Sequence, residues 1–446
     1  MERKLFGTDG IRGHANVDPV TPEVALNLGK ALGRIYRERC GAGATAVLGK
    51  DTRLSGYMLE TALTSGMVSC GMNVFQVGPL PTPAVAHLVR SMNASCGVMI
   101  TASHNPARDN GIKVFGGDGF KLPDEEEGRI EQVMAQAIPG ISYAEIGKAF
   151  RLDDAPGRYI EFAKETIGNL SLHGIRAVLD CANGAAYSIA PSILRELGVE
   201  VIADSCSPDG SNINLHCGAL NPDRICELVR TYRADIGIAL DGDADRVIFS
   251  DSNGRIVNGD RIIGLCALDM KKRGRLKNDA VAVTVMSNLG LLEAMRDNGI
   301  HTEVTAVGDR YVIEAMRKKD IVLGGEQSGH LIFLDYATTG DGIVSALNVL
   351  KLMKQQNKRL SEVTDFMEEY PQILTALSVN SKPPLDEIPG YPELMREAEA
   401  DFNGFGRAVV RYSGTENLCR ILVEAKSREM AEKWHEKITK FLEKAL

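Results

Sequence analysis

The stretch Cys96-Gly-Val-Met-Ile100-Thr-Ala-Ser103-His104-Asn-Pro106 sets a serine and a histidine directly after a short apolar run. The run from Cys96 to Ile100 predicts a buried strand. Asn105-Pro106 predicts a turn, because the residue before a proline is pushed out of the helical region. Ser103 is therefore expected just past the carboxyl end of a strand, where open α/β sheets place their ligand sites. By itself the stretch also fits an ordinary turn whose polar side chains satisfy local backbone groups.

The segments around this strand alternate between helical and extended patterns. Two helices and two strands alternate between Thr21 and Val77, which predicts a parallel, doubly wound sheet. After the serine, Asn110-Gly111 predicts a tight turn into a strand over residues 112–115. That strand carries Lys113, whose ammonium is within chain reach of Ser103 and can offset the charge of a phosphate there.

The same alternation of helical and extended segments repeats twice more along the chain. Its length of 446 residues suggests three or four domains. We expect an α/β fold with three similar mixed α/β sheet domains and a smaller C-terminal α+β domain. The predicted bounds are residues 1–150, 151–253, 254–368 and 369–446, and prolines at positions 371, 383, 384 and 389 mark the last boundary.

Composition and charge narrow the class of protein. Apolar residues make up 44% and charged residues 25%, as in a globular protein with real cores. The net charge of −8 argues against a nucleic-acid partner. No apolar run is long enough to span a membrane, and the first residues lack the apolar core of a signal peptide. The nine cysteines form no CxxC pair, so we expect reduced, mostly buried thiols and a cytoplasmic protein.

A second polar loop follows the apolar run that ends at Leu240. It reads Asp241-Gly-Asp243-Ala-Asp245, and on an extended backbone these alternate carboxylates would face one point. Carboxylates this close raise one another's pKa unless a cation joins them, and a hard divalent ion is the natural occupant. An EF-hand calcium loop fits poorly, because it requires glycine and glutamate where this chain has Arg246 and Ser252. A solvated acidic loop remains the alternative.

Three further loops carry groups suited to a phosphorylated sugar. Arg12, within the glycine-spaced stretch from Phe6 to Gly13, can offer a guanidinium to a phosphate. Glu326 and Ser328 provide the acceptors and the donor that vicinal hydroxyls need. The stretch from Arg411 to Arg420 combines two arginines, hydroxyl side chains, an amide and a glycine, which favours an anion-binding turn. Plain turns remain the alternative for the first two loops.

Together these loops indicate phosphoryl transfer on a phosphosugar. The motifs Phe6-Gly-Thr-Asp-Gly-Ile-Arg-Gly13, Thr101-Ala-Ser-His-Asn-Pro106 and Gly324-Gly-Glu-Gln-Ser-Gly-His330 resemble the α-D-phosphohexomutase superfamily, and the resemblance covers the whole chain. They are most similar to the bacterial members that interconvert glucosamine 6-phosphate and glucosamine 1-phosphate on the route to UDP-N-acetylglucosamine and the cell wall. The resemblance implies four domains around a central cleft, one Mg²⁺ per chain, a glucosamine 1,6-bisphosphate intermediate and a homodimer.

The resemblance also implies roles for single residues. Ser103 would be carried as phosphoserine, and one of its phosphate oxygens would bind Mg²⁺ together with Asp241, Asp243 and Asp245. Glu326 and Ser328 would hold the sugar hydroxyls. The residues matching charged positions around the reacting phosphate are Arg12, His104, Lys113, Arg246 and His330. Those matching the phosphate-binding loop are Arg411, Ser413, Gly414, Thr415, Asn417 and Arg420.

Two positions depart from the family pattern. Ala244 stands where the family often has a second glycine, which matters only if that residue needs a positive φ. Asn417 stands where many members have proline, and unlike proline it can donate a hydrogen bond. Two other functions stay open: a mutase acting on mannose or glucose phosphates, and a metal-dependent phosphosugar-binding protein without turnover.

Overall fold

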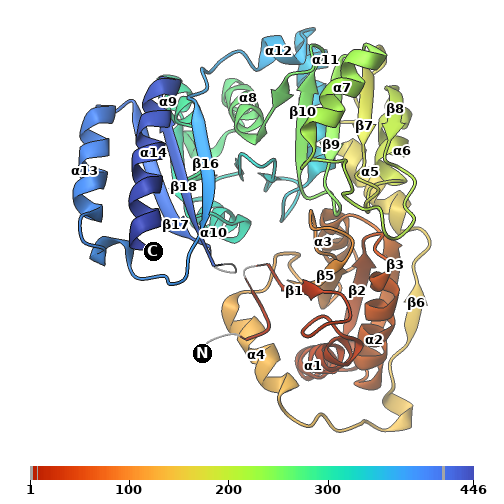
Figure 1. Ribbon diagram of the computed structural model, residues 1–446. Coiled ribbons are helices and arrows are strands. Elements are labelled where there is room, and N and C mark those ends of the chain that lie inside the picture. Colours follow the sequence, from red (N-terminus) through yellow and green to blue (C-terminus); the bar gives the residue numbers. More distant parts are fainter. Residues whose placement is uncertain (1–3, 8, 414–416) are drawn as a thin grey trace.

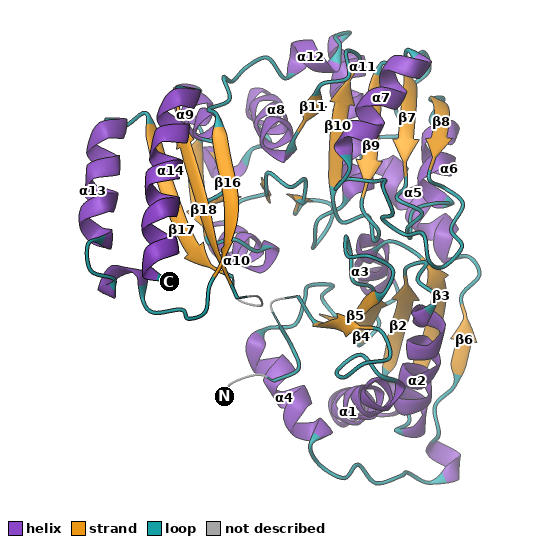
Figure 2. Ribbon diagram, viewed as in Figure 1, coloured by secondary structure: helices purple, strands orange, loops and turns teal. Residues whose placement is uncertain are grey.

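The computed structural model describes residues 4–7, 9–413 and 417–446, and their strands form four separate sheets (Figure 1). Three of the sheets carry helices in α/β order, and the last belongs to a smaller domain at the C-terminal end (Figure 2). The predicted fold class of three mixed α/β domains and one smaller domain is confirmed. Among the helices described, none combines the length and apolar composition that crossing a lipid bilayer requires.

The first domain is built on a six-stranded mixed sheet with the order β1-β5-β4-β2-β3-β6. Its strands are β1 (Ile11–His14), β2 (Thr45–Lys50), β3 (Asn73–Pro79), β4 (Cys96–Ile100), β5 (Asp109–Gly116) and β6 (Ala149–Arg151). Its helices are α1 (Pro22–Cys40), α2 (Ser55–Ser69), α3 (Thr82–Ser91) and α4 (Asp124–Met134). The helix predicted from Thr21 is confirmed, and the Thr21 side chain caps it by accepting from the Val24 backbone.

The tight turn predicted at Asn110-Gly111 is wrong, because both residues lie inside β5. The chain reverses earlier, and the two residues pair instead with Gly13 and Arg12 of β1. Gly111 is needed for close approach rather than for turning, since a Cβ there would lie 2.5 Å from the Ile11 carbonyl oxygen. Pairing with a strand from the N-terminus has overridden the local turn signal.

The second and third domains repeat the α/β pattern with smaller sheets. The second sheet has the order β11-β10-β9-β7-β8 and the third β13-β12-β14-β15. The second domain holds α5 (Ala155–Glu165), β7 (Arg176–Asp180), α6 (Ile189–Glu196), β8 (Glu200–Asp204), α7 (Pro222–Tyr232), β9 (Ile236–Leu240), β10 (Val247–Asp251) and β11 (Ile256–Val257). The third holds α8 (Gly259–Lys272), β12 (Ala280–Thr284), α9 (Leu289–Asp297), β13 (His301–Thr305), α10 (Asp309–Lys319), β14 (Leu323–Gly325), β15 (Leu331–Phe333), α11 (Gly342–Gln356) and α12 (Leu360–Val363).

The C-terminal domain packs two helices on a three-stranded antiparallel sheet of order β16-β18-β17. Its elements are β16 (Gln372–Ser378), α13 (Tyr391–Phe402), β17 (Gly406–Tyr412), β18 (Leu418–Ala425) and α14 (Arg428–Ala445). It has a hydrophobic core of its own around Trp434. The other three domains share one continuous core that runs from Val85 on α3 through Tyr159 to Leu347 on α11. The C-terminal domain is therefore the one most separable from the rest.

Candidate active site

Ser103 lies three residues beyond β4, as the sequence predicts, and its side chain is almost fully buried. Its backbone sits at φ 49°, a left-handed conformation that serine rarely adopts. Its N–H donates to Thr101 Oγ1 at 2.8 Å, and its carbonyl oxygen accepts from Arg53 at 3.2 Å and from Asn214 Nδ2 at 2.8 Å. These hydrogen bonds restrain the backbone on both sides of Ser103 and stabilise its left-handed conformation.

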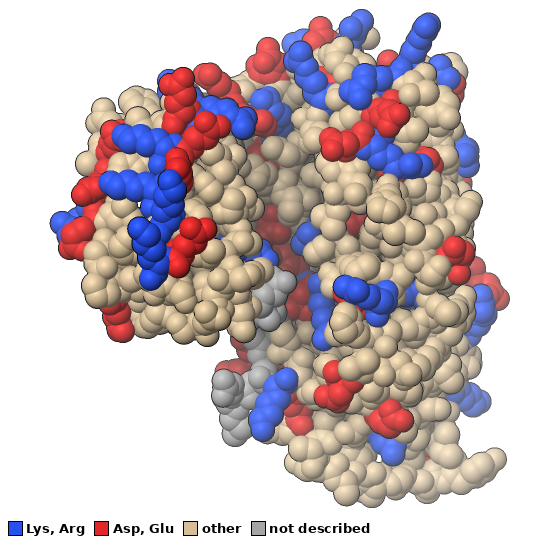
Figure 3. All heavy atoms as spheres, viewed as in Figure 1, with Lys and Arg blue, Asp and Glu red and all other residues tan. Residues whose placement is uncertain are grey.

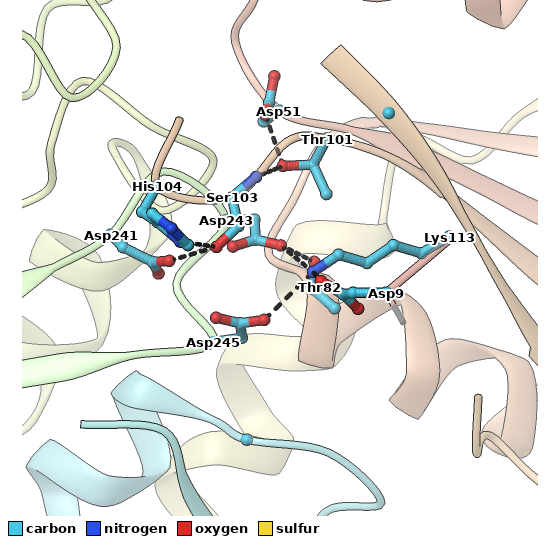
Figure 4. A network of polar contacts seen from close by, with 12 residues as sticks. Asp9, Asp51, Thr82, Thr101, Ser103, His104, Lys113, Asp241, Asp243 and Asp245 are labelled. Atoms are coloured by element: carbon cyan, nitrogen blue, oxygen red, sulfur yellow. Dashed lines mark hydrogen bonds and ion pairs between the residues drawn. The ribbon is translucent and has the colours of Figure 1, made fainter. Parts of the chain in front are cut away.

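The hydroxyl of Ser103 is held between two domains. Its Oγ donates to Asp241 Oδ2 at 2.7 Å, and His104 Nδ1 lies 3.3 Å from the same Oγ (Figure 4). Burial, together with Arg246 and Arg12, lowers the pKa of His104 to about 4. The serine of the first domain and the aspartate loop of the second therefore meet at one point.

The aspartate loop turns instead of running extended, so the predicted extended geometry is wrong. The Ala244 N–H donates to the Asp241 carbonyl at 3.1 Å, and Ala244 itself has φ 56°. Ala244 thus occupies the conformation that favours glycine, at a cost of about 1 kcal/mol. The turn still gathers the side chains, because Asp241, Asp243 and Asp245 each present a carboxylate oxygen within 4.8 Å of the others.

One buried ammonium, that of Lys113, lies among the carboxylates. Lys113 Nζ lies 2.9 Å from Asp243 Oδ2, 3.2 Å from Asp245 Oδ2 and 3.5 Å from Asp9 Oδ2. Burial alone would lower the pKa of Lys113, but Asp243 and Asp9 together hold it well above its usual value. Burial raises the pKa of Asp241 well above its usual range, and the neighbouring carboxylates add to that rise. The negative charge is therefore only partly compensated by the protein.

The aspartates suit a hard divalent ion. Within the described part of the chain, Asp243 Oδ1 is buried without a hydrogen-bond partner, and Asp245 Oδ1 faces His330 Nδ1 at 3.7 Å, beyond hydrogen-bond distance. Each of the two residues uses its other oxygen for Lys113. These two oxygens beside the Asp241 carboxylate offer the all-oxygen ligand set that Mg²⁺ takes, so the three residues can hold a metal ion.

A cleft next to this cluster brings all four domains together. Its volume is about 700 Å³, and Figure 3 shows acidic and basic side chains on the walls of the hollow beside the C-terminal domain. Its predicted site residues come from distant parts of the sequence: Arg12, Ser103, Asp245, Arg246, Glu326, His330, Arg411, Ser413 and Arg420. Asp241, Asp243 and Lys113 lie buried at its floor.

His330 and Lys121 join the third domain to this floor. His330 lies 3.7 Å from Asp245 and 3.7 Å from Asp309, the first residue of α10. Burial would lower the pKa of His330, but Asp245 beside it raises the value overall. Lys121 of the first domain forms ion pairs with both Asp9 and Asp309. The third domain is thus fixed to the first by charge at the cleft.

The loop between β14 and β15 faces the cleft through Glu326. Its carboxylate accepts from the Gly308 N–H at 3.1 Å and from Ser328 Oγ at 3.4 Å. Glu326 is buried, whereas Ser328 is exposed and not part of the cleft lining. Gln327 turns toward the C-terminal domain and donates to Gln372 at 3.0 Å.

The C-terminal domain points two arginines into the cleft. Arg411 on β17 and Arg420 on β18 are direct cross-strand partners. Burial and the neighbouring guanidinium lower the pKa of Arg411. Like charges placed opposite each other are destabilising unless an anion joins them. Ser413 also lines the cleft, Asn417 is exposed outside it, and Gly414 and Thr415 lie outside the described residues.

Several residues of the site were not predicted from the sequence. Asp51 and Arg53 follow the end of β2 and form a buried ion pair behind Ser103, with Asp51 accepting from Thr101 at 2.6 Å. Their position after a strand end is the signal that could have found them. Thr82 donates to Asp243 at 2.5 Å, and neither it nor Asn214 carries a local pattern that marks it.

Comparison with known proteins places this geometry in a class. The four sequence models of phosphoglucomutase/phosphomannomutase match in order: alpha/beta/alpha domain I over residues 3–139, domain II over 157–254, domain III over 258–370 and the C-terminal domain over 374–441. A phosphoglucomutase/phosphomannomutase family protein from Burkholderia thailandensis shares the fold with a TM-score of 0.83 at 23% identity, covering 99% of this chain and 97% of its own. N-acetylphosphoglucosamine mutase of Aspergillus fumigatus, solved with GlcNAc-6P and magnesium, has a TM-score of 0.68 at 17% identity, covering 100% and 96%.

Closer relatives narrow the class further. Phosphoglucosamine mutase of Geotalea uraniireducens is 51% identical over 99% of this chain and 98% of its own length. Phosphoglucosamine mutase of Bdellovibrio bacteriovorus is 50% identical with full coverage of both chains. The chain belongs to the phosphoglucosamine mutase family within the phosphohexomutase superfamily.

Proposed function

We propose that this protein interconverts glucosamine 6-phosphate and glucosamine 1-phosphate, with Ser103 carried as phosphoserine and glucosamine 1,6-bisphosphate as the intermediate. The observation that carries the proposal is the Ser103 hydroxyl, held 2.7 Å from an aspartate cluster at the floor of a four-domain cleft. The full-length relatives named phosphoglucosamine mutase favour glucosamine over mannose or glucose as the sugar.

In this proposal phosphoserine 103 passes its phosphoryl group to the free hydroxyl of the bound sugar phosphate. The hydroxyl loses its proton, the Ser103 oxygen leaves, and the sugar becomes a bisphosphate. The bisphosphate then reorients and returns its other phosphoryl group to Ser103. His104, 3.3 Å from Ser103 Oγ, and His330 at the same floor are the groups suited to moving the proton.

Mg²⁺ held by Asp241, Asp243 and Asp245 would supply a positive charge that stabilises the transferring phosphoryl group. Lys113, kept cationic by its three carboxylate neighbours, adds a second fixed charge at the same point. Arg12 and Arg246 line the cleft, and in the described chain each has a buried Nε without a partner. These guanidinium groups suit the phosphoryl oxygens.

The far end of the cleft suits the phosphate that is not transferred. Arg411 and Arg420 face each other across two strands, and Ser413 adds a hydroxyl. A phosphate bound there would relieve the repulsion between the two cations. Glu326 lines the cleft and would accept from the sugar hydroxyls, and Ser328, whose hydroxyl lies 3.4 Å from the Glu326 carboxylate at the rim, would donate to them. The domain bounds predicted above, the cytoplasmic location and the homodimer remain predictions from the sequence.

A phosphosugar panel on the purified protein with Mg²⁺ tests the proposal. Glucosamine, mannose and glucose phosphates are compared by kcat/KM, and glucosamine phosphate should be preferred. Chelation should stop turnover and added Mg²⁺ should restore it. A preference for mannose or glucose phosphate would keep the chemistry and replace the substrate. No turnover on protein shown by mass to carry phosphate on Ser103 would leave only a binding function.

A further inference from the structure

The second domain carries a pair of cysteines at the ends of its two parallel strands. Cys181 follows β7 directly, and Cys206 lies two residues beyond β8. The strands are in register at Asp180 and Asp204, and the Cys181 N–H donates to the Asp204 carbonyl at 3.2 Å. The Cys206 thiol donates to the same Asp204 carbonyl at 3.1 Å, so the two cysteines meet at one backbone group, and neither is in a disulfide. Two sulfurs at adjacent strand ends meet the first requirement for a disulfide.

The two sulfurs differ in access and acidity. Cys181 is fully buried, whereas Cys206 is half-buried. The contact between the two thiols lowers the pKa of Cys206 and, together with burial, raises that of Cys181 well above its usual value. The reachable sulfur is therefore the one that ionises first, which is the arrangement of an attacking thiolate beside a resolving thiol. By contrast, burial raises the pKa of nearby Cys217 to about 11.

We propose that Cys181 and Cys206 are a reversible redox pair, converted by a peroxide to a disulfide that lowers the activity of the cleft. The Cys206 thiolate attacks one oxygen of hydrogen peroxide, and the departing hydroxide takes up a proton and leaves as water. The Cys181 sulfur then displaces hydroxide from the resulting sulfenic acid, and that hydroxide takes the Cys181 proton and leaves as a second water. The two thiols lose two electrons and the peroxide gains them.

The turn after Cys181 is in direct contact with the parts that hold Ser103. The carbonyl of Ala182 accepts from the backbone of Asn214 at 2.9 Å, and the Asn214 side chain donates to the Ser103 carbonyl at 2.8 Å. The Ala185 N–H donates to the carbonyl of Gly242 in the aspartate loop at 2.8 Å. A disulfide draws two sulfurs to about 2.05 Å, and we expect the turn that supports both the serine and the aspartates to shift as it forms.

The regulatory half of this inference rests on the proposed function, whereas the disulfide itself does not. Misplacing a catalytic group by about 1 Å costs up to about 100-fold in rate, and we expect oxidation to lower kcat about tenfold. Disulfides in reducing compartments are mostly transient and redox-sensing, which fits a pair with one accessible sulfur. Dithiothreitol should therefore restore the activity.

The test uses the full-length protein, reduced and then treated with hydrogen peroxide. Mass spectrometry of an unreduced digest should find the Cys181 and Cys206 peptides linked, with two hydrogens lost. Cys206→Ser should keep its activity in peroxide. Cys40→Ser is the matched control: Cys40 is exposed at the end of α1, and this variant should lose activity as the parent does.

Three results would overturn the inference: no linked peptide, a link from Cys206 to Cys217 instead, or equal inactivation of Cys206→Ser and the parent. A linked peptide with unchanged kcat would overturn the regulatory half. Failure of the proposed function is distinguishable, because untreated protein would then show no turnover while the linked peptide would still form.

Discussion

Replacing Lys113 by methionine tests the charge balance of the site most directly. The lysine side chain is 2% exposed, and its ammonium lies within 3.2 Å of both Asp243 and Asp245, whose side chains are 0% and 5% exposed. Methionine keeps most of the volume and removes the charge. Because the pKa of Lys113 is held well above its usual value, the lysine is charged at every pH below about 10, so its stabilising contribution is fully present at pH 7.5.

The expected loss can be estimated from these distances. Two unit charges about 3 Å apart attract by about 5 kcal/mol at an effective dielectric constant of about 20. Removing one partner of a buried pair typically costs about 3–5 kcal/mol, because the remaining charge is left without compensation. We expect Lys113→Met to lower the free energy of unfolding by about 3 kcal/mol or more in the absence of metal. Mg²⁺ at about 100 times its dissociation constant would return about 2.7 kcal/mol.

Urea unfolding at pH 7.5, with chelator and then with Mg²⁺, measures both effects. Far-ultraviolet circular dichroism follows unfolding of the whole chain. The fluorescence of Trp434, the chain's one tryptophan, follows the C-terminal domain separately, and the urea midpoint that it reports should be the same in the variant as in the parent. Lys50→Met is the matched control, since Lys50 is a buried lysine paired with Glu60 in the same domain. This variant should also lose stability, but Mg²⁺ should raise its free energy of unfolding by no more than it raises that of the parent.

The reasoning is refuted if Lys113→Met unfolds within about 0.5 kcal/mol of the parent without metal, because surface changes alone have effects of that size. It is also refuted if Mg²⁺ stabilises Lys50→Met and Lys113→Met equally. The first result would mean that Lys113 does not compensate the carboxylates. The second would mean that Mg²⁺ does not replace the charge of Lys113, since a metal site intact in both variants is stabilised to the same extent in each.

Three other predictions follow from single residues. Ser103→Ala should abolish mutase turnover while the circular dichroism spectrum and urea midpoint stay near those of the parent; measurable turnover would contradict a phosphoserine step. Burial raises the pKa of Asp260 to about 7, so the folded protein keeps a proton that the unfolded chain loses near pH 4. The contribution of Asp260 to stability therefore falls as pH rises from about 4 to about 7, by at most about 4 kcal/mol. Urea unfolding of Asp260→Asn should show a variant-minus-parent difference that grows across that range, and a flat difference would contradict the shift. Arg411→Ala should raise KM for the sugar phosphate about tenfold, as expected for one lost charge-assisted contact of about 1.4 kcal/mol, whereas Arg428→Ala on the exposed face of α14 should leave KM unchanged.

The sequence predicted those features that depend on local pattern. The α/β alternation was found because buried strands and amphipathic helices have distinct periodicities. Ser103 and the three aspartates were found because polar residues directly after apolar runs mark strand ends. The turn at Asn110-Gly111 was wrong because pairing with β1, almost a hundred residues earlier, decides that segment.

Other parts of the site could not be predicted, because docking between domains creates them. Asn214 has no periodic or motif signal, yet it reaches from the second domain to the carbonyl of Ser103. The extended geometry of the aspartate loop was wrong for a related reason. The Ala244 carbonyl accepts from Gly342 at the start of α11, and this contact with the third domain helps to hold Ala244 in its left-handed conformation.

The division of the hydrophobic cores matches what the proposed reaction requires of each domain. Ser103 and the aspartates belong to domains that share one continuous core, so their relative positions are fixed. Arg411 and Arg420 belong to a domain with its own core. That domain contacts the third through a few polar bonds, such as the one from the Leu289 N–H to Glu424 at 2.8 Å. A bisphosphate that turns around in the cleft must be released at one phosphate while the other end of the site keeps its geometry. A separately packed domain can move its arginines without disturbing the serine, because among the described residues its hydrophobic core is distinct from the one that the other three domains share.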